Sequence, residues 1–237
     1  MPIYKYLIFD VDDTLLDFYH AFQTAQRDIA EKLGIVPSKE YLETDEKCGW
    51  KAWEESGLDQ TEDKNVQDNY HAYYYQYLRK HFEYLLEAYR KVYDVQELVD
   101  CYLESISSSK VLKEQDALDI YMKLSEKYKL VLATNGIERV QKERISDFWP
   151  YTHRLYISET IGFIKPTEGF YHYIINDLKC RPEECLMIGD SITNDIVGAK
   201  AIGMNVCYYN ANGKRKPENV SVDYEVNSLH NLAQILL

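Results

Sequence analysis

The spacing of apolar residues changes sharply near the start of the chain. Positions 4–9 (YKYLIF) form a short aromatic and β-branched run, which is typical of a buried strand. This run ends in the acidic stretch DVDD at positions 10–13. We therefore predict a strand that leads directly into a polar loop.

Residues 17–109 follow a helical pattern instead. Apolar residues recur at helical spacing in its first part, at Phe22, Ala25, Ile29 and Leu33. Gly34 follows where such a helix would end, and Asp94 with Glu97 forms a capping-box-like helix start. We predict four or five helices, with residues 107–109 (SSS) as the linker that leaves them, and a solvated helix face for the acidic run at 43–46.

After position 111, strand-like and helix-like segments alternate. The expected strands are 130–133, 155–157, 186–188, 206–209 and, more weakly, 224–226; the expected helices are 115–127, 137–148, 168–178 and 194–202. Such alternation is typical of a parallel sheet that helices cover on both faces. We predict an α/β fold: a doubly wound, Rossmann-like core from residues 1–16 and 110–237, with an inserted all-helical cap at 17–109 over the carboxyl ends of the strands.

Composition narrows the classes of partner. The 237 residues carry a net charge of -12, which disfavours a nucleic-acid polymer because duplex binding needs a basic face; one local positive pocket would still suit a small anionic substrate. The sequence has no apolar run near the roughly 18 residues that a membrane span needs and no secretory-signal pattern at its start. We expect no membrane partner, a cytoplasmic location, and a monomer or homodimer. The five cysteines and six histidines are scattered, without zinc-site spacing.

Polar residues suited to chemistry follow several of the predicted strands. They are Asp10 and Asp12, Thr134 and Asn135, Lys165, and Asp190 and Asp195. Because the carboxyl ends of parallel strands meet at one edge of a sheet, we expect these side chains to share one pocket.

Such a pocket would concentrate negative charge, since four aspartates together are costly to bury without compensation. Magnesium resolves this best, because it accepts one or two carboxylates together with water and substrate phosphate. Lys165 would add a second positive centre, and Thr134 and Asn135 would donate hydrogen bonds to phosphoryl oxygens. These are the groups that phosphoryl transfer requires.

The four signals, in this order, resemble the motifs of the haloacid dehalogenase-like (HAD) hydrolase superfamily across nearly the whole chain. The matching positions are Asp10, Asp12 and Thr14 in the first motif, Thr134 in the second, Lys165 in the third, and Gly189, Asp190 and Asp195 in the fourth. The resemblance implies a phosphatase of the helical-cap type that uses Mg²⁺.

The resemblance also implies a role for each position. Asp10 would be the nucleophile and a metal ligand, and Asp12 the general acid and then base, with its backbone carbonyl touching the metal. The other implied roles are phosphoryl binding by Thr134 and Asn135, charge neutralisation by Lys165, direct metal ligation by Asp190, orientation or water-mediated contact by Asp195, and loop support by Thr14. Two simpler roles remain open: Asp195 could cap a helix, and Asn135 could be a turn residue.

Asp12 favours a phosphatase or a phosphomutase, because the family's dehalogenases lack an acid at this position. We expect hydrolysis of small phosphate monoesters, with a nucleoside 5′-monophosphate as the first candidate substrate. A β-phosphoglucomutase-like sugar phosphomutase and a catalytically silent regulatory or binding protein of the same fold remain as alternatives. Trp50 and Trp53 resemble part of the cap in the pyrimidine 5′-nucleotidase branch and are candidates to line a substrate slot. The tyrosines at 70–77 are expected mainly to pack in the core and to be partly exposed at the surface.

Overall fold

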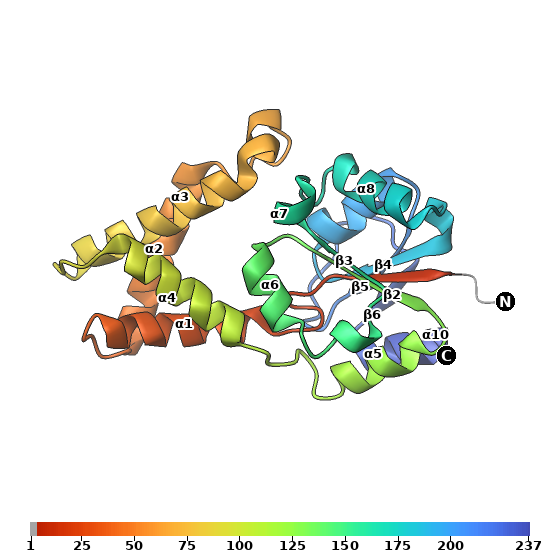
Figure 1. The fold of residues 1–237 in the computed structure, drawn as a ribbon, viewed down its shortest axis with the longest axis horizontal. Helices are drawn as coiled ribbons and strands as arrows, with labels where there is room; N and C mark the ends of the chain where they lie inside the picture. The colour runs from red at the N-terminus through yellow and green to blue at the C-terminus, as the bar shows by residue number, and fades with distance from the viewer. Residues whose placement is uncertain (1–3) are drawn as a thin grey trace. The chain divides into compact units, whose positions relative to one another are not determined.

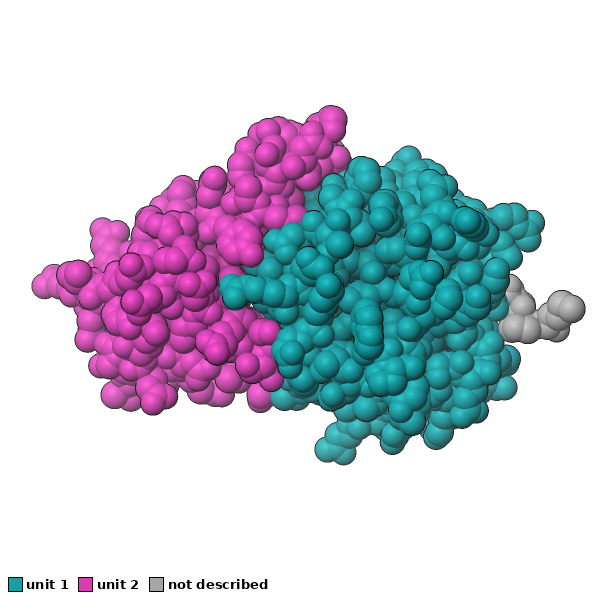
Figure 2. Space-filling model, in the orientation of Figure 1, with its two compact units in different colours: residues 1–17, 110–237 teal, residues 18–109 magenta. Residues whose placement is uncertain are grey.

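The chain forms two compact units in the computed structural model, which describes residues 4–237. Residues 1–17 and 110–237 make up one unit, called the α/β unit here, and residues 18–109 make up the helical unit. Figure 1 traces the elements of both, and Figure 2 colours the units separately.

The described part of the α/β unit is built on a six-stranded sheet in the order β3-β2-β1-β4-β5-β6, in which every neighbouring pair is parallel. The strands are β1 (Tyr6–Phe9), β2 (Lys129–Thr134), β3 (Arg154–Ile157), β4 (Cys185–Gly189), β5 (Asn205–Tyr209) and β6 (Tyr224–Val226). This order is that of a doubly wound fold, so the predicted α/β class is confirmed. The chain runs to one side of β1 first and later returns to its other side, which makes β1 and β4 the point where the strand order reverses.

Alternate residues of each strand enter different cores. Leu7 and Phe9 of β1 pack in a cluster with the helices at 117–125 and 229–236. Tyr6 and Ile8 pack on the opposite face with the helices at 168–178 and 198–201. All four are buried, which explains why the strand reads as a continuous apolar run rather than an alternating one.

The helices of the α/β unit lie between the strands in sequence, except the last one, which follows β6. They are α5 (Ala117–Ser125), α6 (Glu138–Arg144), α7 (Ser158–Ile161), α8 (Glu168–Leu178), α9 (Gly198–Ala201) and α10 (Leu229–Leu236), with short 3₁₀ turns η1 (Trp149–Tyr151) and η2 (Pro182–Glu184) and the π-helical segment η3 (Ile192–Val197). The expected helix at 168–178 forms with those bounds, and Thr167 accepts a hydrogen bond from the Phe170 N–H at its start. The helix expected at 137–148 stops at Arg144, because the chain turns and enters η1.

Residues 18–109 contain the four helices α1 (Phe18–Lys32), α2 (Lys39–Ser56), α3 (Lys64–Ala88) and α4 (Val95–Ser108). The predicted helix start at Asp94 is confirmed, since its carboxylate accepts hydrogen bonds from the N–H groups of Gln96 and Glu97. The predicted exit linker is wrong in part: residues 107 and 108 form the last turn of α4, and the chain leaves the helix at Ser109.

A buried polar network joins three helices of the helical unit. Asp45 of α2 accepts one hydrogen bond from Gln26 of α1 at 2.9 Å and pairs with His81 Nε2 of α3 at 2.9 Å. The expectation of a solvated face at 43–46 is therefore wrong for Asp45, which is 2% exposed. A buried carboxylate needs such partners, because burial without them is costly.

In the part of the chain that the structure describes, every helix is too short or too polar to cross a bilayer.

Candidate active site

The candidate site lies where the strand order reverses. Asp10 directly follows β1, and Asp190 directly follows the neighbouring β4; the N–H of Asp10 donates to the carbonyl of Ile188 at 2.9 Å. Thr134 is the last residue of β2 on the other side of β1. Open α/β sheets bind ligands at such a point, at the carboxyl ends of the strands.

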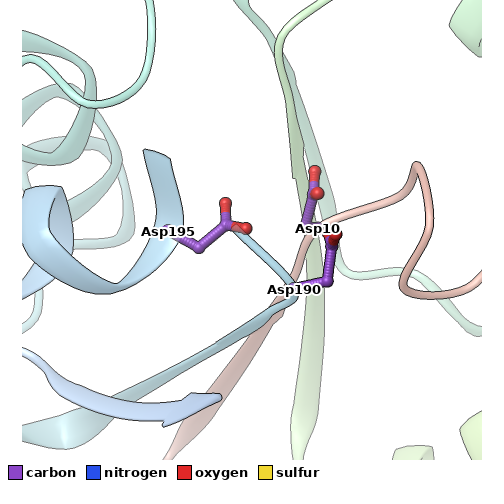
Figure 3. A group of neighbouring side chains, drawn as sticks. All are labelled: Asp10, Asp190 and Asp195. Atoms are coloured by element: carbon purple, nitrogen blue, oxygen red, sulfur yellow. The ribbon is translucent and has the colours of Figure 1, made fainter. Parts of the chain in front are cut away.

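Three carboxylates converge there. Asp10, Asp190 and Asp195 each offer an oxygen, and these oxygens lie within 4.8 Å of one another. Figure 3 shows Asp10 and Asp190 side by side at the ends of their strands, with Asp195 reaching toward them from its helical turn. Asp195 is fully buried and Asp10 nearly so. Residues far apart in sequence thus form one acidic cluster.

Burial and crowding disfavour the charged forms of these groups. Burial first, and the neighbouring Asp195 second, raise the pKa of Asp10 well above its ordinary value. The same two causes raise the pKa of Asp190 to about 6. A hard divalent cation bound by carboxylate oxygens would reverse both effects. The donor set therefore fits Mg²⁺, to which Asp10, Asp190 and Asp195 could each offer a carboxylate oxygen.

Lys165 compensates part of this charge. Its ammonium group donates to Asp10 Oδ1 at 2.6 Å and to Asp195 Oδ1 at 2.7 Å, and its side chain is 2% exposed. Burial alone would lower the pKa of Lys165, but the two carboxylates outweigh burial and raise that pKa above its ordinary value. The lysine therefore stays charged beside the candidate nucleophile.

Asn135 fixes the segment that carries this lysine. Its side-chain oxygen accepts from the Lys165 N–H at 2.8 Å, and its side-chain nitrogen donates to the Lys165 carbonyl at 2.9 Å. The Asn135 side chain is thus engaged with the Lys165 backbone, which the sequence did not indicate.

Asp195 also has a second contact. Its Oδ2 accepts from the Ser191 N–H at 3.0 Å, while its Oδ1 binds Lys165. A Cβ atom at Gly189 would lie 2.3 Å from Asp195 Oδ2, so a residue without a side chain is required there. Asp195 both holds the loop after β4 and orients Lys165.

The loop after β1 has its own supports. Thr14 is fully buried and donates to Asp190 Oδ1 at 3.4 Å. Asp13, which has a left-handed φ of 57°, pairs with Lys113 at 2.8 Å. Lys113 is a contact that sequence reasoning missed, since 100 residues separate the two partners.

Asp12 has two partners that sequence reasoning also missed. Arg144 Nη1 forms an ion pair with Asp12 Oδ1, and Gln141 Nε2 donates to Asp12 Oδ2 at 2.7 Å. One signal was present: both residues lie among the apolar positions of the predicted helix at 137–148, and a polar side chain on a buried helix face needs a partner.

The helical unit contains an aromatic pocket of about 560 Å³. Residues of all four helices line it, and they include Trp50, Trp53, Tyr74 and Tyr77. The ring of Trp53 meets that of Tyr77 edge-on at 5.4 Å. Trp50 is 64% exposed, so part of the aromatic surface of this pocket is accessible and is not buried in the core of the unit. Tyr74 and Tyr77 are only partly buried and contribute to the pocket as well as to packing.

The chain is similar to known proteins along most of its length. The family model for haloacid dehalogenase-like hydrolases matches residues 4–203. YfnB of Bacillus subtilis, named as a HAD-hydrolase, is 30% identical, and the match covers 100% of this chain and 97% of YfnB. The pyrimidine 5′-nucleotidase PynA of Streptococcus pneumoniae is also 30% identical, over 98% of this chain and 95% of PynA.

Solved structures agree with these sequence matches. A crystal structure of YfnB bound to magnesium has a TM-score of 0.84 at 27% identity and covers 98% of both chains. A family-model match of this extent, together with a relative matched over nearly its full length, is sufficient to assign membership. The chain belongs to the haloacid dehalogenase-like hydrolase family.

Proposed function

We propose that this protein is a magnesium-dependent phosphatase that hydrolyses small phosphate monoesters through an aspartyl-phosphate on Asp10. The observation that carries the proposal is the buried Asp10 carboxylate, which contacts the Lys165 ammonium at 2.6 Å and lies beside Asp190 and Asp195. A nucleophile, a fixed positive charge and a cation-binding cluster in one place are the groups that phosphoryl transfer uses.

The chain's own residues would divide the reaction into two displacements. A carboxylate oxygen of Asp10 attacks phosphorus, the bond between phosphorus and the ester oxygen breaks, and Asp12 gives its proton to the leaving oxygen. Water then attacks the phosphorus of the aspartyl-phosphate, Asp12 takes a proton from that water, and the bond from phosphorus to Asp10 breaks. Phosphate leaves, and both aspartates return to their starting forms.

The remaining groups would bind and orient the phosphoryl group. Lys165 would balance its charge, and the Thr134 hydroxyl and the Asn135 N–H would donate to its oxygens. Asp10, Asp190 and the backbone carbonyl of Asp12 would hold Mg²⁺. Bound Mg²⁺ would supply positive charge for the phosphoryl oxygens and keep the Asp10 carboxyl group ionised.

We further propose a nucleoside 5′-monophosphate as the substrate, with residues 18–109 acting as a cap domain. The aromatic pocket of the helical unit supports this, because aromatic rings stack on nucleobases for roughly 1–3 kcal/mol per base. Relatives named pyrimidine 5′-nucleotidase support it as well: PynA, and YjjG of Escherichia coli at 32% identity over 46% of this chain. In this proposal, Trp53 and Tyr77 bind the base of the leaving nucleoside.

The reaction is tested with p-nitrophenyl phosphate in the presence and absence of Mg²⁺. We expect release of phosphate that depends on Mg²⁺ and on Asp10. If the wild type releases no more phosphate than Asp10→Asn, the phosphatase proposal is wrong.

The substrate class is tested by comparing UMP with glucose 6-phosphate and glycerol 2-phosphate. We expect UMP to have the highest kcat/KM, and Trp53→Ala to raise its KM by about 5–160-fold, as loss of one stacking contact of roughly 1–3 kcal/mol predicts. The same variant should leave glycerol 2-phosphate hydrolysis nearly unchanged. A preference for glucose 6-phosphate, or an equal effect of Trp53→Ala on all three substrates, would exclude the nucleotide proposal.

A further inference from the structure

Both oxygens of the Asp12 carboxylate have a fixed partner from α6. Arg144 Nη1 pairs with Oδ1, and Gln141 Nε2 donates to Oδ2 at 2.7 Å. Arg144 is 1% exposed and Gln141 2%, whereas the Asp12 side chain is 25% exposed. The two partners therefore hold the carboxylate from the buried side and leave it accessible from the other.

Gln141 connects Asp12 to the end of β2. Its Nε2 also donates to Thr134 Oγ1 at 2.8 Å, and its Oε1 accepts from Arg144 Nη1 at 3.4 Å. These contacts need the amide nitrogen on one side and the amide oxygen on the other, so they fix the orientation of the amide. Asp12, Thr134, Gln141 and Arg144 thus form one hydrogen-bonded set.

The local structure around α6 places the side chains of Gln141 and Arg144 in this hydrogen-bonded set. Gln141 and Arg144 are three residues apart in the helix, so they lie on the same face. A Cβ atom at Gly136 would lie only 2.8 Å from Gln141 Cγ, so the glycine leaves the space that the glutamine fills. Gln141 is consequently tied to the strand end that carries Thr134, and Arg144 is linked to it through Gln141.

A buried arginine is weak evidence for stability, because desolvation of the ion pair offsets most of its attraction. The need to position the Asp12 carboxylate explains the buried arginine better than stability does. A general acid must come within about 2.6–3.2 Å of the atom it protonates, and an error of about 1 Å can lower a rate ~10²-fold. The carboxylate of Asp12 could otherwise rotate about two side-chain bonds.

We infer that Gln141 and Arg144 are positioning residues that hold the Asp12 carboxylate in the orientation for general acid–base catalysis. This inference rests on the proposed phosphatase function, because it assigns Asp12 the proton transfers of that reaction. Gln141 and Arg144 do not touch the reacting phosphorus; they act through Asp12.

The test compares leaving groups that differ in their need for a proton. The p-nitrophenolate ion leaves without one, whereas the alkoxide of UMP or glycerol 2-phosphate needs protonation as it leaves. For Arg144→Met and Gln141→Leu, we expect kcat/KM for the alkyl phosphate to fall by about 10²-fold or more, and kcat/KM for p-nitrophenyl phosphate to fall far less. Because kcat/KM reports the steps up to leaving-group departure, slow hydrolysis of the phosphoenzyme does not mask this ratio.

The second half of the reaction gives an independent readout. If Asp12 is misplaced, water attacks the aspartyl-phosphate slowly, so both variants should release a rapid burst of p-nitrophenol and accumulate acid-stable label from a ³²P substrate. Arg144→Lys, which keeps the charge, should restore part of the alkyl-phosphate activity. Arg139→Met is the matched control, since Arg139 is exposed on the same helix, and it should behave like the wild type.

Circular dichroism and thermal unfolding establish that each variant is folded. If Arg144→Met does not fold, Gln141→Leu and Gly136→Ala carry the test, because Gly136→Ala displaces Gln141 without changing any charge. Folded variants that keep the wild-type ratio between the two substrates, with no burst, would overturn the inference. A wild type that releases no phosphate would instead refute the proposed function.

Discussion

Removal of one carboxylate from the acidic cluster should stabilise the metal-free protein. Asp190→Asn is the clearest change, because asparagine has nearly the same shape and keeps an oxygen for the Thr14 hydroxyl. Burial and the neighbouring Asp195 raise the pKa of Asp190 from an ordinary 3.8 to about 6. The folded protein therefore holds this carboxylate ion less favourably than the unfolded chain does.

The size and the pH range follow from that pKa. At about 1.36 kcal/mol per pKa unit, the ionised Asp190 lowers the free energy of unfolding by at most about 3 kcal/mol. Since the folded-state pKa is the higher one, the penalty is absent below the unfolded value of 3.8, grows as pH rises toward 6, and is complete above it. Asp190→Asn should thus raise Tm in EDTA at pH 7.5 by up to about 6–12 °C, at roughly 2–4 °C per kcal/mol for a chain of this size.

Magnesium should largely cancel this difference in stability. Binding to the folded state stabilises the wild type by about 2.7 kcal/mol when Mg²⁺ reaches 100 times its Kd, and Asp190→Asn should gain much less because a ligand is lost. Thermal unfolding followed by near-ultraviolet circular dichroism, with EDTA or Mg²⁺ at several pH values, measures both effects. Asp147→Asn, at an exposed site of the same unit, is the control for a simple change of net charge.

Two results would refute this reasoning. The first is a metal-free Asp190→Asn protein no more stable than the wild type at pH 7.5. The second is a stability difference between the two proteins that stays constant between pH 5 and 7.5. Either outcome would mean that burial and the neighbouring Asp195 do not disfavour the ionised Asp190 in solution.

Three further predictions concern supports of the fold and the site. Lys165→Met should abolish phosphate release and lower the free energy of unfolding by about 3–5 kcal/mol in urea titrations, because it leaves buried carboxylates without their cation; unchanged stability would contradict the buried ion pair. Gly198→Ala should lower the free energy of unfolding by about 1–3 kcal/mol, since the new Cβ would lie 2.7 Å from the Pro166 carbonyl oxygen, and a wild-type Tm would contradict the close packing there. Asp45→Ala should lower it by about 1–3 kcal/mol, because the buried side chains of His81 and Gln26 lose the carboxylate that they contact, whereas Asp45→Asn should have a smaller effect in the same titrations.

Elements with a local signal were predicted well from the sequence. The helix at 168–178 has apolar residues at helical spacing and a threonine before it, and both features act within a few residues. The end of α6 was missed because Ile145 and Phe148 continue the apolar spacing and are buried after the helix has stopped, so hydrophobic spacing alone could not mark its end. Boundaries of this kind depend on how the chain turns to reach the next strand.

The positions of the candidate site were predictable for a different reason. Asp10, Asp190 and Thr134 stand directly at the ends of strands, so the topology of a parallel sheet brings them to one edge once the strands are recognised. Lys165 lies in a loop, and two signals distinguished it from a solvated lysine: its place in the loop after the predicted strand at 155–157, and its match to a family motif.

The partners that hold these groups could not be predicted in the same way. Asp12 and Gln141 are 129 residues apart, and hydrophobic periodicity, which is local, contains no information about which buried polar side chains will meet. Asp45 shows the same limit, because an aspartate in an acidic helical run has the pattern of a solvated face until a histidine from another helix is packed against it. Buried polar residues on an otherwise apolar helix face, as at Gln141 and Arg144, are therefore the best sequence signal for such partners. They require a hydrogen-bonding group from elsewhere in the chain, and here that group is the carboxylate proposed to transfer the proton.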